Sequence, residues 1–264
     1  MDLQLKGKRA LVSGSSAGIG FAIAKALANE GASVIVNGRS AVRTKVAAKT
    51  ITDNGALTPV YPFIGDLSKS SDIERLSAEI PEVDILVNNL GIYEPKPFEA
   101  ITDEDWLRFF EINVLSGIRL CRFYLPGMRE RDWGRIVFIS SESAVNIPVE
   151  MIHYGMTKTA QLAIARGLAE TTAGTGITVN SVLPGPTRSE GVNDFVSKMA
   201  HDKGVSTAKI EEEFFKNVRP SSLLKRFATV DEVAAMVAYV CSPLASATNG
   251  AALRVDGGVV RSIV

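Results

Sequence analysis

Short apolar runs alternate along the chain with segments in which apolar residues recur at helical spacing. The apolar runs predict strands over residues 9–13, 33–36, 60–64, 84–88, 135–139, 177–183 and 252–255. The helical spacing predicts helices over residues 19–30, 41–52, 69–80, 102–129, 151–172 and 230–241. Strands that are apolar throughout are typical of a parallel sheet covered on both faces. We therefore expect a doubly wound α/β fold with about seven strands.

The length of the chain suits one large α/β domain. We predict a single Rossmann-type domain over residues 1–264, with helices on both faces of its sheet. The segment 187–225 follows the carboxyl end of a predicted strand, where ligands bind in such folds, and it is long and rich in charge. We expect it to be an insertion that forms a lid over the site; a packing appendage or an oligomer contact is the alternative.

The composition narrows the class of partner. Hydrophobic residues make up 46% of the chain and charged residues 22%, and the formal net charge is +0. Nucleic-acid binding needs an excess of basic charge, so we predict a small-molecule substrate and no nucleic-acid partner. The chain has no apolar stretch of about 18 residues and no secretory pattern at its start, so we expect a cytoplasmic protein without membrane contact.

Cysteine and histidine are too sparse to suggest a disulfide framework or a metal centre. Cys121 and Cys241 lie far apart in the sequence, which indicates buried, reduced thiols. His153 and His201 do not by themselves make a metal site, so we predict no metal.

A glycine-rich turn follows the first predicted strand and opens a helix. Glycines in such a turn let the backbone approach a pyrophosphate, and the helix presents free N–H groups to the phosphates. We therefore predict a dinucleotide site whose contacts include Gly14, Ser16, Gly18, Ile19 and Gly20.

The end of the second predicted strand distinguishes between cofactors. An acidic residue there would hydrogen-bond the ribose 2′-hydroxyl of NAD, and none is present. Arg39 instead offers a planar guanidinium suited to a 2′-phosphate, and Ser16 and Ser40 can add hydroxyl donors. We predict a preference for NADP(H), with NAD(H) as the alternative cofactor.

The spacing Gly-x-x-x-Gly-x-Gly resembles the short-chain dehydrogenase/reductase family, and further matches follow in the family's order. Leu90 stands in place of alanine in the family's Asn-Asn-Ala-Gly motif. The matching residues, which together span essentially the whole chain, are Gly14, Gly18, Gly20, Asn88, Asn89, Gly91, Asn113, Ser141, Tyr154, Lys158, Pro184 and Gly185.

The resemblance implies that Asn113, Ser141, Tyr154 and Lys158 are catalytic. Tyr154 and Lys158 are four residues apart in a predicted helix, so they share a face, and an ammonium lowers the pKa of a nearby phenol from its ordinary value near 10. Tyr154 would be the general acid or base, and Ser141 would polarise the substrate oxygen. Lys158 would also bind the nicotinamide ribose. Asn113, by opening its own helix turn, would hold a water that passes protons to Lys158.

The resemblance also implies further cofactor contacts. Asp66 and Leu67 would flank the adenine, Asn88 and Gly91 would line the adenosine side, and Thr187 and Ser189, after Pro184 and Gly185, would contact the carboxamide or the pyrophosphate. A helix cap is the alternative role for Asp66, and strand-end hydrogen bonds are the alternative for Asn88.

Two residues beside the predicted catalytic group have simpler interpretations. Glu142 is expected to be a salt-bridged loop carboxylate, with tuning of the substrate charge as the alternative. His153 is expected to be an exposed or hydrogen-bonded structural residue, with a place in the substrate pocket as the alternative.

These features predict an NADP(H)-dependent oxidoreductase that interconverts a carbonyl and a secondary alcohol. The alternatives are a β-ketoacyl-acyl carrier protein reductase and a dinucleotide-binding sensor without turnover. Asp132 and Thr175 stand where such reductases carry arginines that grip the carrier protein, although Arg131 is adjacent. By resemblance, the predicted helices 102–129 and 151–172 would form the interfaces of a homotetramer or homodimer.

Overall fold

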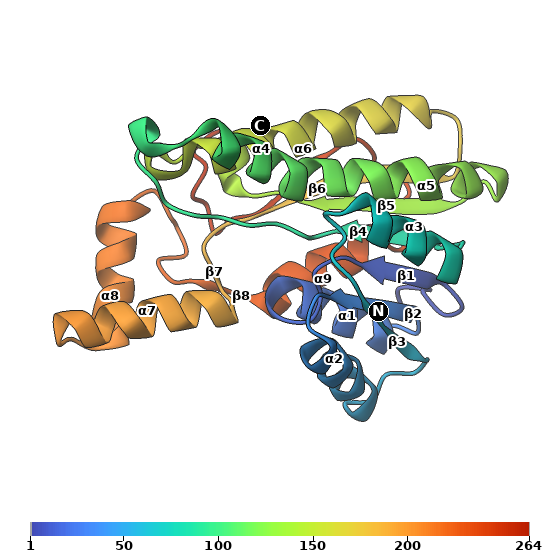
Figure 1. The fold of residues 1–264 in the computed structure, drawn as a ribbon, viewed down its shortest axis with the longest axis horizontal. Coiled ribbons are helices and arrows are strands. Elements are labelled where there is room, and N and C mark those ends of the chain that lie inside the picture. Colours follow the sequence, from blue (N-terminus) through green and yellow to red (C-terminus); the bar gives the residue numbers. More distant parts are fainter. Residues whose placement is uncertain (1, 264) are drawn as a thin grey trace.

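The computed structural model describes residues 2–263, without the side chain of Phe195. Within this part of the chain seven strands form one parallel sheet in the order β3-β2-β1-β4-β5-β6-β9 (Figure 1). The strands are β1 (Arg9–Val12), β2 (Ser33–Gly38), β3 (Val60–Ile64), β4 (Ile85–Asn88), β5 (Gly134–Ile139), β6 (Ile177–Pro184) and β9 (Ala252–Val255). The strand order reverses between β1 and β4, which is where doubly wound sheets bind their ligands.

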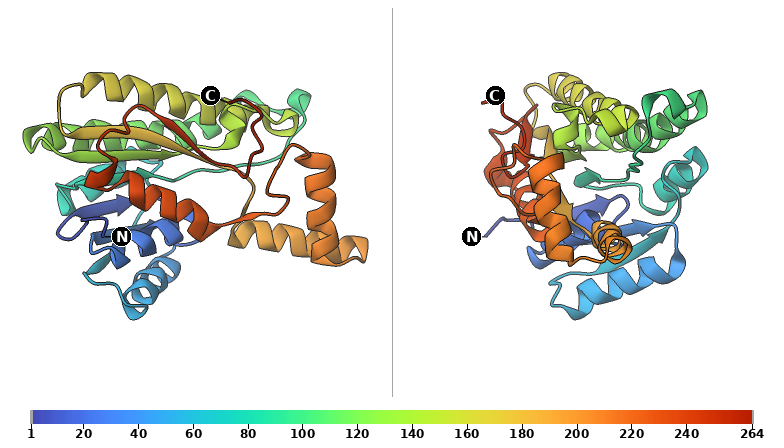
Figure 2. Two further views of the ribbon diagram at one scale, coloured as in Figure 1. Left: turned by 180° about the vertical axis from the view of Figure 1, so that it is seen from behind. Right: turned by 90° about the vertical axis from the view of Figure 1, so that its left-hand side faces the viewer.

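Helices cover both faces of the sheet (Figure 2). One layer contains α1 (Gly18–Asn29), α2 (Ala41–Asp53) and α9 (Val230–Val240), and the other contains α3 (Ser70–Glu79), α5 (Ser116–Glu130) and α6 (Ile152–Thr171). Successive residues of β1 serve opposite layers, because side chains alternate along a strand: Ala10 and Val12 pack into one core and Leu11 into the other. The predicted fold class is confirmed.

The predicted helix 102–129 is divided. Thr102 caps α4 (Asp103–Phe110), a π-helical turn follows over Glu111–Leu115, and α5 then continues. The N–H of Ser116 donates to the carbonyl of Glu111, five residues earlier, so the turn is wider than an α-helical turn. Asn113 lies in this turn, as the resemblance implied. Short 3-10 turns also occur at Phe98–Ala100, Glu142–Ala144, Val149–Met151 and Pro243–Ala245.

The predicted insertion contains two helices on a small base of their own. Strand β7 (Thr187–Arg188) pairs in parallel with β8 (Ala228–Thr229), and α7 (Glu190–Lys203) and α8 (Thr207–Glu213) lie between them, followed by a π-helical turn over Phe214–Val218. The helices project from the carboxyl end of the sheet (Figure 1). They enclose a separate apolar cluster made by Val196, Ala200, Ile210, Phe215 and Phe227.

Both cysteines are buried and unpaired, as predicted. Between residues 2 and 263, no helix is long and apolar enough to cross a membrane. Over the same residues, His, Cys, Asp and Glu side chains form no group of three or more that could hold a metal ion.

Candidate active site

The glycine turn after β1 adopts a backbone that only glycine accommodates well. Gly14 and Gly18 both have φ of +60°, in the left-handed region. A Cβ on Gly20 would lie 2.4 Å from the amide nitrogen of Asn89 and 2.5 Å from the carbonyl oxygen of Gly14. The turn therefore requires glycine at these positions.

Two asparagines to which the sequence analysis assigned no role hold this turn. The side-chain amide of Asn89 donates to the carbonyls of Ser13 at 3.0 Å and Gly14 at 2.9 Å. The fully buried Asn37 accepts from the N–H of Gly14 at 3.0 Å and donates to the carbonyl of Gly65 at 3.0 Å. Asn89 lies within the Asn-Asn-Leu-Gly motif, so its place in that motif was the one sequence signal that could have predicted its role in holding the turn.

The N-terminus of α1 lacks a side-chain partner. Ala17 is its N-cap residue, no side chain caps the helix, and its first turn holds no acidic residue. The first N–H groups of a helix need acceptors and favour negative charge. A cavity of about 440 Å³ adjoins this end and is lined by residues that include Ser16, Gly18 and Arg43. These features fit a dinucleotide whose pyrophosphate lies at Gly14, Ser16, Gly18, Ile19 and Gly20.

At the end of β2 the structure exposes Arg39. Among residues 2–263 its guanidinium has no hydrogen-bond or ion-pair partner. A Cβ on Gly38 would lie 2.8 Å from the Ser16 hydroxyl, so Ser16 lies against the end of the same strand. Ser40 caps α2, and Arg43 on that helix pairs with Glu190 at 2.5 Å. Arg43 is a second cation at this edge that the sequence analysis did not identify.

The side chains predicted to contact the adenosine are more buried, or more engaged within the protein, than expected. Asp66 accepts from the N–H of Ser68 at 3.1 Å and from its hydroxyl at 2.7 Å, so one carboxylate oxygen caps its own turn. Leu67 is fully buried in the core, and the Asn88 side chain turns toward Cys121 on α5. Because these two side chains point inward, a cofactor contact by Leu67 or Asn88 would have to use main-chain atoms. Their role at the cofactor stays a prediction.

The predicted catalytic residues converge at the carboxyl ends of β4 and β5. Ser141 follows β5, and Tyr154 and Lys158 lie on α6, with Lys158 Nζ 5.6 Å from the centre of the Tyr154 ring. A Cβ on Gly91, which follows β4, would lie 3.5 Å from both Lys158 Nζ and Asn113 Oδ1. Gly91 therefore lies next to Lys158 and Asn113, and because it has no side chain it leaves the space between them open.

Lys158 is buried between the sheet and its own helix. Its ammonium donates to the carbonyl of Ile139 at 2.8 Å and to Gln161 Oε1 at 3.3 Å. Burial lowers the pKa of Lys158 to about 7.

Tyr154 was expected to have a lowered pKa, and in the cofactor-free protein this is wrong. Burial raises the pKa of Tyr154, and the Ser141 hydroxyl only partly opposes this. The physical reason is that Lys158 directs its ammonium to Ile139 and Gln161 and is itself desolvated.

Asn113 is held through its side-chain amide and its main-chain carbonyl. Its side chain accepts from the N–H of Ile92 at 2.8 Å and donates to the Ile92 carbonyl and the Thr157 hydroxyl, both at 3.0 Å. Its main-chain carbonyl accepts from the Gln161 amide at 2.6 Å. The resemblance placed a water between Asn113 and Lys158; here the Gln161 side chain spans the two residues. The sequence analysis missed Gln161, which lies three residues after Lys158 and so shares its helix face.

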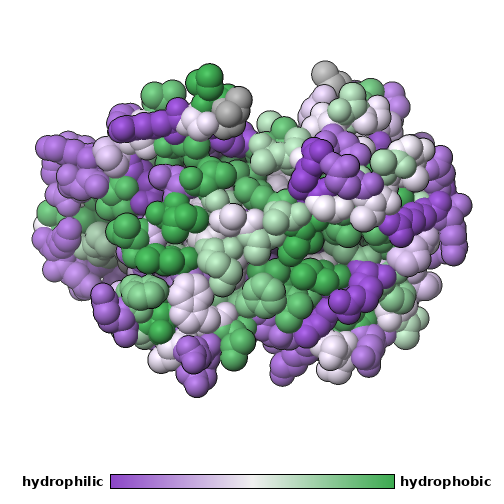
Figure 3. All heavy atoms as spheres, turned by 90° about the horizontal axis from the view of Figure 1, so that it is seen from above, coloured by the Kyte–Doolittle hydropathy of each residue, from purple (hydrophilic) through white to green (hydrophobic). Residues whose placement is uncertain are grey.

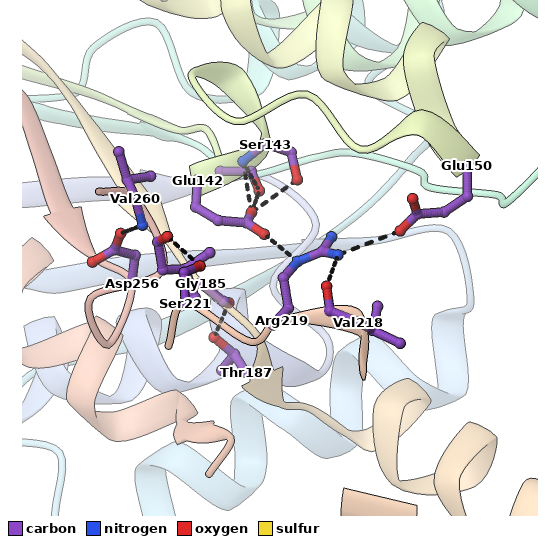
Figure 4. A network of polar contacts seen from close by, with 12 residues as sticks. Glu142, Ser143, Glu150, Gly185, Thr187, Val218, Arg219, Ser221, Asp256 and Val260 are labelled. Carbon is purple, nitrogen blue, oxygen red and sulfur yellow. Dashed lines mark hydrogen bonds and ion pairs between the residues drawn. The ribbon is translucent and has the colours of Figure 1, made fainter. Parts of the chain in front are cut away.

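A second buried polar group includes Ser141 and is centred on Glu142, which lies between Ser143 and Arg219 (Figure 4). The Ser141 hydroxyl lies 2.5 Å from Glu142 Oε2, and Glu142 Oε1 accepts from Arg219 Nε at 3.1 Å. Arg219 also pairs with Glu150 at 3.4 Å. The expected salt bridge of Glu142 is confirmed. Its partner lies in the insertion, 77 residues away in sequence, and nothing in the local sequence indicated it.

The segment after β6 closes the other side of the site. A Cβ on Gly185 would lie 2.6 Å from the carbonyl oxygen of Asp256, so this position admits no side chain. Pro184 ends β6, and the Thr187 hydroxyl donates to the Gly185 carbonyl at 2.9 Å (Figure 4). Ser189 caps α7, and its Cβ lies 3.6 Å from where a Cβ on Gly18 would be. The base of the insertion therefore lies next to the glycine turn.

The expectation for His153 is wrong. His153 is fully buried, and neither ring nitrogen has a hydrogen-bond partner among the described residues. Its ring packs 4.0 Å from Phe109 and 5.9 Å from Trp106, between centroids. Because α4 covers this face of α6, His153 is enclosed by aromatic side chains. Burial lowers its pKa.

The sheet, the glycine turn and the polar group at its carboxyl edge define a dinucleotide-dependent oxidoreductase. A family model described as Enoyl-(Acyl carrier protein) reductase matches residues 14–260. The chain is 47% identical over 263 residues to the uncharacterized oxidoreductase YvaG of Bacillus subtilis, with 100% of both chains covered. It is 30% identical to dehydrogenase/reductase SDR family member 4 of Caenorhabditis elegans, over 97% of this chain and 96% of that one.

Solved structures agree with this assignment. L-Sorbose reductase from Gluconobacter frateurii, complexed with NADPH and L-sorbose, superposes with a TM-score of 0.93 at 29% identity and covers 100% of both chains. A 7α-hydroxysteroid dehydrogenase complexed with NADH gives a TM-score of 0.84 at 30% identity, over 100% of this chain and 98% of that one. The chain belongs to the short-chain dehydrogenase/reductase family. It is an oxidoreductase that acts on alcohol and carbonyl groups with a nicotinamide cofactor.

Proposed function

We propose that the protein is an NADP(H)-dependent carbonyl reductase in which Tyr154 transfers the proton. The observation that carries this proposal is the meeting of Ser141, Tyr154 and Lys158 beside Gly91, next to the glycine turn. The bound nicotinamide supplies the hydride in reduction and accepts it in oxidation. Tyr154 donates its proton to the carbonyl oxygen in the first direction and accepts the alcohol proton in the second.

Lys158 and Asn113 support this proton transfer. Lys158 lies on the same helix face as Tyr154 and has a pKa of about 7, so its charge responds to changes near neutral pH. Through its ammonium it would bind the nicotinamide ribose and so orient the cofactor. Asn113 fixes the segment after β4 through Ile92 and holds Lys158 indirectly through Gln161.

The preference for NADP(H) is supported by Arg39. The guanidinium is exposed and has no partner between residues 2 and 263, and no carboxylate ends β2. A planar guanidinium suits a 2′-phosphate. One structural relative is bound to NADPH and another to NADH. Equal or better use of NADH by this protein would therefore contradict the preference.

A carrier-protein substrate has less support. Asp132 accepts from the N–H of Gly176 at 2.8 Å and so joins two loops, and the Thr175 hydroxyl donates to the Thr172 carbonyl at 2.7 Å within its own turn. Arg131 donates to the carbonyl of Val83 at 3.0 Å. These contacts favour a small soluble ketone over a carrier-bound one.

We also propose that the protein forms a homodimer or a homotetramer through α4, α5 and α6. Figure 3 views the molecule from the side of these helices and shows apolar side chains gathered across that face. Leu107, Phe110 and Phe123, on α4 and α5, are 69%, 36% and 39% exposed. Sedimentation equilibrium tests this; a monomer at micromolar concentration contradicts it.

The proposed function is tested by following NADPH and NADH consumption with a panel of ketones, ketoses and β-ketoesters. Tyr154→Phe should lower turnover at least about a thousandfold, since the proton donor is lost, while cofactor affinity changes little. Tyr239→Phe, at an exposed position of α9, is the matched control. Retained turnover in Tyr154→Phe contradicts the mechanism. Tight cofactor binding without turnover of any compound favours the sensor.

A further inference from the structure

Tyr93 lies between Tyr154 and the insertion. Its ring meets the Tyr154 ring edge to face, with 6.4 Å between the centroids. Its hydroxyl oxygen lies 3.6 Å from where a Cβ on Gly191, in the first turn of α7, would be. Tyr93 nevertheless stays 56% exposed. A largely apolar ring is therefore open to a ligand next to the proposed proton donor.

The loop before α6 adds apolar surface beside Tyr154. A Cβ on Gly155, which follows Tyr154, would lie 2.9 Å from Ile147 Cγ2, and Ile147 is still 44% exposed. The N–H of Lys96 donates to the carbonyl of Glu150 at 2.9 Å, so this loop runs next to the segment that follows β4. Two neighbouring segments thus present exposed apolar side chains to the site, and a substrate that covers them removes their surface from water.

The charged side chains next to these apolar ones are paired within the protein. Arg219, from the insertion, lies 3.1 Å from Glu142 and 3.4 Å from Glu150 (Figure 4). Two carboxylates share one guanidinium, so the group carries an excess of negative charge. Lys96, in the segment after β4, pairs with Asp105. A carboxylate on a substrate would be repelled here, and neither Arg219 nor Lys96 is free to pair with it.

We propose that the site takes neutral ketones with an apolar substituent and rejects keto acids, and that Tyr93 is the specificity-determining residue that packs on the substituent. This inference rests on the proposed function, because it takes Tyr154 as the place where the carbonyl binds. An apolar substituent is stabilised by covering Tyr93 and Ile147. A carboxylate in the same place would lose its water and gain no partner.

Two pairs of methyl ketones test the two effects separately. 4-Phenylbutan-2-one adds a phenyl ring to butan-2-one, and the methyl ester of 4-oxopentanoate lacks the charge of the free acid. With NADPH, kcat/KM should favour the phenyl ketone over butan-2-one, and the ester over the acid, each by about a hundredfold.

Variants assign these preferences to residues. Tyr93→Ser should lower the preference for the phenyl ketone at least about tenfold, because the ring surface is lost. Tyr61→Ser is the matched control, since Tyr61 is 50% exposed on β3, at the edge of the sheet, and the preference should stay unchanged. Glu150→Gln removes the excess negative charge and should lower the preference for the ester about threefold. Glu74→Gln, at an exposed position of α3, is its control.

The absence of a preference within one of the two pairs overturns the inference. So does an unchanged preference in Tyr93→Ser or in Glu150→Gln, or an equal fall in the matched control. If Tyr93→Ser does not fold, the two pairs decide the inference in the unmodified enzyme.

Turnover of none of the four ketones counts against the proposed function instead. Titration calorimetry on the Tyr154→Phe variant with NADP⁺ bound then decides the inference without turnover. Binding of 4-phenylbutan-2-one but not of 4-oxopentanoate supports it. Equal or tighter binding of the acid, or no binding of the phenyl ketone, overturns it.

Discussion

The side-chain amide of Gln161 donates to the main-chain carbonyl of Asn113 at 2.6 Å. Its amide oxygen accepts from Lys158 at 3.3 Å, and Gln161 is 1% exposed. One side chain therefore joins the widened turn between α4 and α5 to the lysine on α6. Its position depends on the packing of α6 against that turn.

Gln161→Leu should lower kcat about tenfold or more and change its pH dependence. Leucine is similar in size, but it leaves both the Asn113 carbonyl and the Lys158 ammonium without this buried partner. Loss of the acceptor further disfavours the charged lysine, so the pKa of Lys158 should fall. The measurement is the pH profile of kcat. Arg166→Leu, on the exposed side of α6, is the control, and an unchanged profile in Gln161→Leu speaks against a positioning role.

Lys158→Met should change how the stability of the cofactor-free protein depends on pH. The pKa of Lys158 is about 7 when folded, against an ordinary 10.5, so the unfolded chain binds the proton more tightly. Unfolding of the unmodified protein takes up a proton between these values, and its stability rises with pH by up to about 1.4 kcal/mol per unit. The methionine variant lacks this rise. Urea unfolding from about pH 7 to 9.5 tests it, and parallel curves refute it.

Arg39→Asp should reverse the cofactor preference. The aspartate would repel a 2′-phosphate and accept from a 2′-hydroxyl, so kcat/KM for NADPH relative to NADH should fall roughly a hundredfold. Lys45→Asp makes the same charge change at an exposed position of α2 and should leave the ratio within about twofold. If both variants lower the ratio equally, the preference depends on the overall positive charge of this surface and not on Arg39 itself.

Gly20→Ala should impair folding or cofactor binding, and Gly167→Ala should not. A Cβ at Gly20 meets the Asn89 amide at 2.4 Å and the Gly14 carbonyl at 2.5 Å, whereas nothing lies within 4 Å of one at Gly167. The first change should cost about 1–3 kcal/mol. The second replaces glycine inside α6 and should be neutral or stabilising by up to about 1 kcal/mol. Thermal unfolding with and without NADPH measures both. Equal melting temperatures would remove the steric argument.

The sequence predicted the sheet well because its strands are apolar on both faces. The bounds of Val60–Ile64 and Ala252–Val255 agree with the prediction, and other strand ends differ by a residue or two. It also predicted which residues gather at the carboxyl edge, since parallel strands end there together. The directions of individual side chains were harder to predict. Arg219 reaches Glu142 only because the insertion folds back, and His153 is enclosed only because α4 covers α6.

The pairing of β7 with β8 has a consequence for how such enzymes diversify. Residues 189–227 leave and re-enter the domain through two adjacent strands, and their apolar side chains pack largely on one another. Such a segment can be exchanged as a cassette, because a change within it does not alter the register of the main sheet. Arg39 lies outside this segment, whereas Ser189 and Glu190 within it adjoin the glycine turn and Arg43, so an exchange that keeps these two residues should change the substrate range and leave the cofactor ratio unchanged. A chimera with this segment from a relative should keep the cofactor ratio and acquire the donor's substrate profile; a chimera whose cofactor ratio follows the donor would show that the two are not separable.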